Sequence, residues 1–292
     1  MKLFLIRFIM RVLSLVTPKA AEYLAPPVAA ILWYLSPRKR RVTRLNLRAA
    51  YPDMGSKQRA KIGRASMTHY IRGVFEAGML WYWPMDKISS CFAEIRGLEY
   101  LEEALSSGKG TIIAAPHCGA WEMLNLFMNQ YGPAILYKPG RHADINQMLL
   151  EKRRRSGARM IPANATGVRS MFKLLNNGQL VALLPDQEPT GGEGQFAPFF
   201  GVEALTGVLL PRLARRTGAA VLFSVCERTQ GGRYQVHFFK ADEAIYAADL
   251  RIAATAVNRG IEECIAVDTN QYLWAYKRFR NRPAGEGSFY KR

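Results

Sequence analysis

Short apolar runs of strand length alternate with helical patterns between residues 111 and 239, and this alternation limits the possible folds most strongly. The apolar runs cover residues 111–115, 134–137, 159–162, 180–184, 220–226 and 234–239. Helical patterns cover residues 122–129, 145–155, 168–176, 205–216, 250–267 and 271–280. Alternating strands and helices predict an α/β fold with a largely parallel central sheet flanked by helices on both faces.

The amino-terminal 50 residues have the features of a segment that associates with a membrane. Residues 1–90 show helical patterns throughout, and in the apolar stretch MKLFLIRFIMRVLSLV the charges of Arg7 and Arg11 share one helix face. A second apolar stretch, residues 23–34, ends in Trp-Tyr before the basic run 38–41, a pattern typical of the headgroup level of an anionic leaflet. Neither stretch offers the roughly 20 uninterrupted apolar residues of a spanning helix. We therefore expect shallow embedding, with a true span or two ordinary core helices as the alternatives.

Bulk properties narrow the class of protein and of partner. The chain has 292 residues and no flexible linker. From the patterns above we distinguish a membrane-associating helical segment, residues 1–50, from an α/β domain, residues 51–292. A net charge of +18 predicts attraction to a polyanion. The four cysteines lie far apart, and the glycines match no phosphate-binding loop. We expect free thiols, no metal site and no cofactor.

The segment TIIAAPHCGAWE, residues 111–122, holds the first candidate site. Its strand-like run delivers His117 at the carboxyl end, where ligands of open α/β sheets bind, and Glu122 follows five positions later. A histidine oriented by a carboxylate can remove a proton from a hydroxyl at neutral pH. We predict that His117 is the general base and Glu122 its orienting partner, with backbone N–H groups near Gly119 stabilising an oxyanion.

Further candidates lie outside this segment. Asp186 closes the run LVALLPD and should reach the same sheet edge as His117, although an aspartate there is also common as the first residue of a turn. In the basic helical pattern we single out Arg154 and Arg155, together with Arg169, as side chains able to grip a phosphate; a solvated helix face is the alternative. Cys118 should point into the core.

The block HCGAWE resembles the H-x-G-x-W-E block of the bacterial lipid A biosynthesis acyltransferases, within the glycerolipid and lysophospholipid acyltransferase superfamily. Residues 40–53, 183–187 and 196–206 extend the resemblance in matching order. It implies an O-acyltransferase on the cytoplasmic face of the bacterial inner membrane. This enzyme would transfer a fatty acyl chain from acyl carrier protein, or from acyl-CoA, to a hydroxyl of a lipid A precursor without an acyl-enzyme. The resemblance gives His117 and Glu122 the catalytic roles, and Asp186 and the arginines substrate-binding roles. We expect a monomer whose partners are the carrier protein and anionic membrane lipid, not nucleic acid.

Some positions depart from the family pattern. Cys118 and Ala120 replace the aromatic residue and the asparagine common in this block, and Gln187 stands where histidine is frequent. Because of these differences, the acceptor is also open to other identities: a lysophospholipid, an ornithine-type lipid or another lipid. Two rival hypotheses are a thiol-based acyltransferase that uses Cys118 and a non-enzymatic basic protein that binds membranes or nucleic acid.

Overall fold

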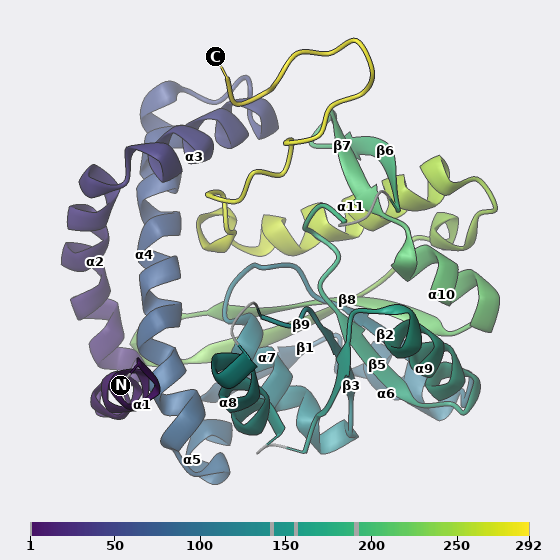
Figure 1. The fold of residues 1–292 in the computed structure, drawn as a ribbon, viewed down its shortest axis with the longest axis horizontal. Coiled ribbons are helices and arrows are strands. Elements are labelled where there is room, and N and C mark those ends of the chain that lie inside the picture. Colours follow the sequence, from purple (N-terminus) through teal and green to yellow (C-terminus); the bar gives the residue numbers. More distant parts are fainter. Residues whose placement is uncertain (1, 141–142, 155–156, 190–192, 292) are drawn as a thin grey trace.

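The centre of the molecule is a seven-stranded sheet (Figure 1). The computed structural model describes residues 2–140, 143–154, 157–189 and 193–291. In spatial order the strands are β1 (Phe92–Arg96), β9 (Tyr234–Lys240), β8 (Ala220–Arg228), β2 (Thr111–Ala114), β5 (Leu180–Leu183), β3 (Ala134–Tyr137) and β4 (Arg159–Pro162). Neighbouring strands are parallel except β8 and β9, which are antiparallel. The predicted α/β fold with a largely parallel central sheet is confirmed.

Helices cover both faces of this sheet. Because side chains alternate along a strand, Ile112 and Ala114 of β2 face one hydrophobic cluster and Ile113 the other. The first cluster includes residues of α9 (Ala165–Asn176), α10 (Leu209–Thr217) and α11 (Leu250–Val267). The second includes residues of α5 (Met85–Ser89), α6 (Leu98–Ser106) and α7 (Trp121–Met128). Burial on both faces explains why the β2 and β5 runs are continuously apolar.

A layer of amino-terminal helices stands beside the sheet, at the left of Figure 1. It comprises α1 (Lys2–Leu13), α2 (Pro18–Leu35), α3 (Pro37–Ala50) and α4 (Ser56–Tyr82). The Thr17 hydroxyl caps α2 by accepting the Ala20 N–H at 3.1 Å, and a proline in the first turn suits both α2 and α3. Small buried residues of α2, among them Ala25 and Ala29, pack against α4. The expectation of helices over residues 1–90 is confirmed.

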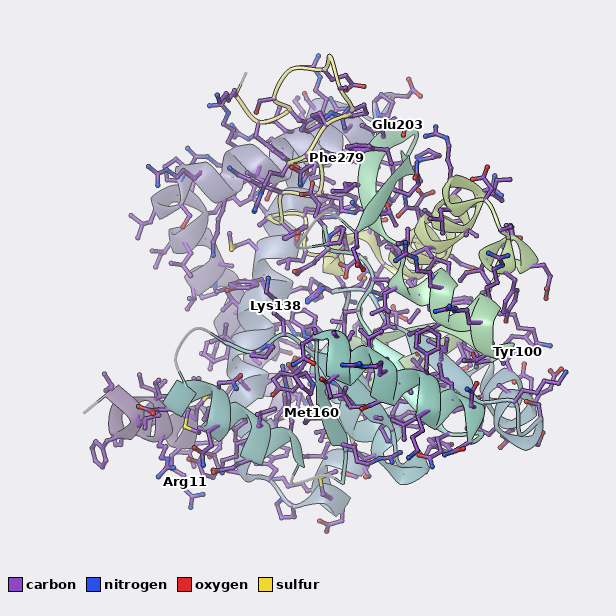
Figure 2. All side chains as sticks on the ribbon, turned by 45° about the vertical axis from the view of Figure 1, so that its right-hand side comes forward. Arg11, Tyr100, Lys138, Met160, Glu203 and Phe279 are labelled. Atoms are coloured by element: carbon purple, nitrogen blue, oxygen red, sulfur yellow. The ribbon has the colours of Figure 1, made fainter. Side chains whose placement is uncertain are left out.

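Large apolar side chains on α1 and α2 remain exposed. They are Phe4, Leu5, Phe8, Ile9 and Val12 on α1, and Tyr23, Leu24, Val28, Ile31, Tyr34 and Leu35 on α2. In Figure 2 α1 lies at the margin of the molecule, and the guanidinium of Arg11 lies 5.2 Å from the centroid of the Tyr82 ring of α4. Ordinary core helices bury such side chains, so this pattern disfavours that alternative. Within the described ranges, no helix has the length and apolar character needed to cross a bilayer.

Three segments differ from the sequence-based expectation. Residues 194–207, for which the sequence predicts no strand and a helix from residue 205, form an antiparallel hairpin of β6 (Gly194–Phe199) and β7 (Val202–Gly207). Phe200 and Gly201 form its tight turn with positive φ angles of 50° and 74°. Residues 271–280 are not helical beyond the 3-10 turn η4 (Thr269–Gln271) because their backbone bonds to distant groups, such as the His117 carbonyl. The edge strand β1 was not predicted.

Candidate active site

The register of two neighbouring strands brings His117 and Asp186 together. Ala114 of β2 pairs with Leu183 of β5, and the histidine and the aspartate each follow three residues later. Nδ1 of His117 lies 2.8 Å from Oδ1 of Asp186, and the His117 backbone N–H donates to Oδ2 at 3.0 Å. Asp186 is 2% exposed, whereas the His117 side chain keeps 20% of its surface open. The prediction that both residues belong to one site is confirmed by this contact.

The pair holds opposite charges in a buried setting. Burial lowers the pKa of His117, but the charge of Asp186 and its hydrogen bond to the ring raise this pKa, which lies above 6.5. Burial raises the pKa of Asp186, but the charge of His117 and the hydrogen bonds from its ring and backbone outweigh this effect, so the pKa lies below 3.8. An ionised Asp186 accepts a hydrogen bond from Nδ1–H, so the proton of the neutral ring is on Nδ1. The lone pair that a general base needs is then on Nε2.

Glu122 has a different partner from the one predicted. It lies in the first turn of α7, where Nε of Arg153 donates to Oε2 at 3.3 Å and Nη2 of Arg153 donates to Oε1. The prediction that Glu122 holds the imidazole nitrogen is wrong, because Asp186 occupies that position. Arg153 belongs to α8 (Ala143–Arg154) and was not among the arginines singled out. The sequence shows the basic run that contains Arg153. It does not show that α8 places Arg153 within reach of Glu122 on α7.

Gly119 is needed for the path of the chain. Its φ is +61°, and a Cβ at this position would lie 2.1 Å from the carbonyl oxygen of Cys226. Its N–H donates to the Gln271 carbonyl at 3.1 Å, and the Ala120 N–H donates to the Cys226 carbonyl at 2.7 Å. The amides of Gly119 and Ala120 are therefore engaged, so these two groups do not fit the predicted oxyanion role.

The other predicted residues have varied outcomes. Arg155 and the side chain of Arg154 lie outside the described residues. Arg169 is exposed on α9, and none of the described contacts joins it to His117, Asp186 or Glu122. Cys118 is 1% exposed, and burial raises its thiol pKa. The expectation that Cys118 faces the core is confirmed, and a protonated buried thiol is a poor nucleophile.

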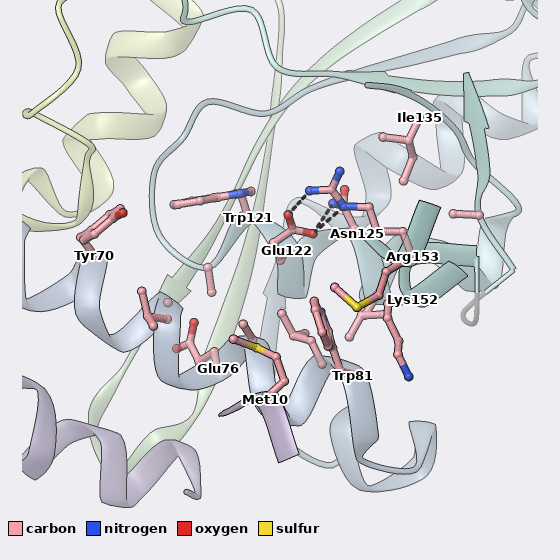
Figure 3. A pocket seen from close by; sticks show the side chains of 18 of the residues that line it. Met10, Tyr70, Glu76, Trp81, Trp121, Glu122, Asn125, Ile135, Lys152 and Arg153 are labelled. Carbon is pink, nitrogen blue, oxygen red and sulfur yellow. Dashed lines mark hydrogen bonds and ion pairs between the residues drawn. The ribbon is translucent and has the colours of Figure 1, made fainter. Parts of the chain in front are cut away.

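An apolar cavity of about 410 Å³ adjoins this site (Figure 3), and we call it the large cavity. Its walls come mainly from α1, α4, α7 and α8, and include Met10, Ala77, Leu80, Trp81, Leu126 and Met148. Trp121 connects it to the histidine, because the two ring centroids lie 5.4 Å apart. Two ion pairs, Glu122 with Arg153 and Glu76 with Arg228, interrupt the mainly apolar wall (Figure 3).

The site thus combines an imidazole held by a carboxylate with an adjoining apolar cavity. The described residues contain no group of three or more His, Cys, Asp or Glu that could hold a metal ion. An oriented imidazole can activate a hydroxyl, and the apolar cavity can hold hydrocarbon. Transfer of a fatty acyl chain to an alcohol can use this combination.

Comparison with known proteins agrees with this geometry. The chain is 28% identical over 259 residues to a lipid A biosynthesis lauroyltransferase of Escherichia coli, covering 87% of this chain and 83% of that protein. A lipid A biosynthesis palmitoleoyltransferase of the same organism is 29% identical over 258 residues, or 87% and 82%. A phosphatidylinositol mannoside acyltransferase of Mycobacterium tuberculosis is 31% identical over 141 residues, or 45% and 43%. The family described as bacterial lipid A biosynthesis acyltransferase matches residues 1–281, so the chain belongs to this family and is an O-acyltransferase.

Proposed function

We propose that this enzyme transfers a fatty acyl chain from the thioester of acyl carrier protein to a hydroxyl of a lipid A precursor. The observation that carries the proposal is the hydrogen-bonded pair of His117 and Asp186 beside the large cavity. The cavity has the apolar lining that a fatty acyl chain requires. Acyl-CoA is the alternative donor, since it carries the same thioester.

In the proposed mechanism His117 is the general base. Its Nε2 takes the proton of the acceptor hydroxyl while the oxygen attacks the thioester carbon. The carbon–sulfur bond then breaks, and His117 returns the proton to the leaving thiolate. Asp186 keeps the ring in the productive tautomer and stabilises the imidazolium. No acyl-enzyme forms, which agrees with the buried state of Cys118.

Arg153 is our candidate for stabilising the negative charge on the carbonyl oxygen. The backbone amides of Gly119 and Ala120 already donate to carbonyl groups, so we assign this role to a side chain. Glu122 fixes the guanidinium of Arg153 at the wall of the large cavity. A preoriented cation in a largely apolar pocket stabilises developing charge effectively.

The surface of the molecule fits a membrane-bound substrate and an acidic donor protein. The exposed apolar side chains of α1 and α2 suit shallow embedding in a bilayer, and we place the enzyme on the cytoplasmic face of the inner membrane. The net charge of +18 favours both anionic lipid and the acidic carrier protein. The rival hypothesis of a non-enzymatic basic protein is contradicted by the family to which the chain belongs.

A different lipid acceptor is the second candidate. The match to a phosphatidylinositol mannoside acyltransferase covers 45% of this chain, and it favours a lipid acceptor of another kind. The donor chemistry and the roles of His117 and Asp186 would stay the same, so only the acceptor distinguishes the two candidates.

A direct transfer assay tests the proposed function. The purified enzyme, in mixed micelles with acyl carrier protein loaded with a fatty acid, should acylate a lipid A precursor, detected by mass spectrometry as a gain of one acyl group. Parallel reactions contain a lysophospholipid or an ornithine lipid, and the His117→Ala variant is the inactive control. A product only with one of the other acceptors would support the second candidate. No product with any acceptor would contradict acyl transfer as the function.

The pH dependence of kcat/KM should report the titration of His117. We expect kcat/KM to rise with pH and level off above an apparent pKa higher than 6.5, because only the neutral imidazole accepts a proton. In Asp186→Asn the residual activity should titrate at lower pH, because burial still lowers the pKa of His117 but the carboxylate no longer raises it. An unchanged midpoint in this variant would show that Asp186 does not control the ring.

A further inference from the structure

A second cavity lies along the same helix as the large cavity. It has a volume of about 210 Å³, and we call it the small cavity. From α4 it is lined by Gly63, Ser66, Met67 and Tyr70, whereas the large cavity is lined by Tyr70, Gly73, Val74, Glu76, Ala77, Leu80 and Trp81. Apart from Glu76, these positions recur at spacings of three or four residues and therefore share one face of α4. At 1.5 Å per residue this face extends over about 27 Å, with Tyr70 between the two cavities.

Tyr70 stands opposite the catalytic side of the large cavity. In Figure 3 its phenol and the ring of Trp121 point toward each other across the pocket. The Trp121 ring in turn contacts the imidazole of His117. The boundary between the two cavities therefore lies close to the reacting position.

Residues 273–276 of the small cavity are hydrogen-bonded to the backbone of the two segments that carry His117 and Asp186. The N–H of Leu273 donates to the carbonyl of His117 at 3.1 Å. The hydroxyl of Tyr276 accepts the N–H of Glu188 at 2.9 Å, two residues beyond Asp186. The side-chain amide of Asn46 fixes this wall by donating to the carbonyl of Tyr276 at 2.7 Å. The small cavity thus borders the site from a side different from that of the large cavity.

The lining of the small cavity suits hydrocarbon, and its rim suits an anion. Met67, Leu273, Ala275 and the tyrosine rings supply apolar surface. Lys39 is exposed at the rim, with its ammonium nitrogen 4.8 Å from the centroid of the Tyr70 ring. Arg38 and Arg41 are also exposed on the same turns of α3. An anionic lipid matches both features, because its chain is apolar and its headgroup is negative.

We propose that the small cavity binds a hydrocarbon chain of the acceptor lipid, with its anionic group near Lys39. The donor chain then occupies the large cavity, and the two chains approach His117 from the two halves of the α4 face. This inference rests on the proposed function for the identity of the donor, but the binding of an anionic lipid to the small cavity does not depend on it.

Two matched substitutions separate the cavities. Ala275 and Ala77 are both half-buried alanines, one in each cavity. Ala275→Leu should raise KM for the acceptor lipid at least tenfold, because the larger leucine side chain takes up space that the acceptor chain needs in the small cavity. It should leave the preference for donor chain length unchanged. Ala77→Leu should shift the donor preference toward shorter chains and leave the acceptor KM within about twofold. The reverse pattern, or no effect of a folded Ala275→Leu, would overturn the proposal.

A binding measurement needs no turnover, and one of its variants changes only an exposed side chain. Dodecyl phosphate below its micelle concentration, titrated calorimetrically into the full-length enzyme, should bind roughly tenfold more weakly to Ala275→Leu and severalfold more weakly to Lys39→Gln, but equally well to Ala77→Leu. Lys39 is exposed, so its replacement should not disturb folding. Equal affinity of all four proteins, or loss confined to Ala77→Leu, would overturn the small-cavity site. Binding of the expected pattern by an enzyme without transferase activity would instead contradict the proposed function alone.

Discussion

Replacing Asp186 with Asn should lower kcat about 10³- to 10⁴-fold, as should replacing His117 with Ala. The carboxylate of Asp186 accepts the Nδ1–H at 2.8 Å and the His117 backbone N–H at 3.0 Å. An asparagine can present its amide N–H to Nδ1, which places the ring proton on Nε2 and removes the lone pair that acts as base. The change is nearly isosteric, so the fold should survive while the chemistry fails.

Steady-state kinetics with the double variant test whether the two residues act as a unit. His117→Ala combined with Asp186→Asn should be no slower than His117→Ala alone, because residues that serve one step are strongly non-additive. Glu122→Gln is the matched carboxylate control. It should retain the pH profile of the wild type, since Glu122 contacts Arg153 and not the ring. A Glu122→Gln variant as inactive as Asp186→Asn, with the same change in pH profile, would restore Glu122 as the orienting partner.

The location of the site could be predicted from the sequence, but the pairing within it could not. Apolar runs ending at residues 115 and 184 show that His117 and Asp186 each follow the carboxyl end of a predicted strand. That β2 and β5 are direct neighbours, with Ala114 opposite Leu183, is a property of the assembled sheet. The H-x4-E spacing places Glu122 near the histidine along the chain, yet it puts the glutamate in the first turn of α7, where Arg153 can reach it.

The misread segments have a common physical cause. The central strands β2 and β5 are buried on both faces, so their apolar composition identifies them, whereas the edge strand β1 is largely exposed and has no such composition. The β6–β7 hairpin is short and contains Pro198, which a two-stranded sheet tolerates because each strand has a free edge. The segment 271–280 is held by tertiary hydrogen bonds, such as those from Asn46 to the carbonyls of Trp274 and Tyr276. Local pattern carries no information about such contacts.

Separating the buried ion pair of Glu76 and Arg228 should destabilise the fold by about 3–5 kcal/mol, the usual effect of leaving one buried charge without its partner. Glu76 of α4 receives hydrogen bonds at 2.7 and 2.6 Å from Arg228 of β8, and a third at 3.0 Å from the hydroxyl of Tyr234. The two charged side chains are 4% and 2% exposed. Chemical unfolding of Glu76→Leu and of Arg228→Met, followed by circular dichroism, measures the effect.

The double variant Glu76→Leu with Arg228→Met should recover most of the stability lost by either single change, because apolar side chains of similar size avoid an unpaired buried charge. The control is Glu203→Gln in the exposed pair with Arg251, which should leave the unfolding midpoint nearly unchanged. Additive losses in the double variant would mean that the two residues stabilise the fold independently. The pair joins the amino-terminal helices to the sheet and also lines the large cavity. Folded double variants should therefore bind the donor chain with altered length preference, since the charged part of that wall becomes apolar.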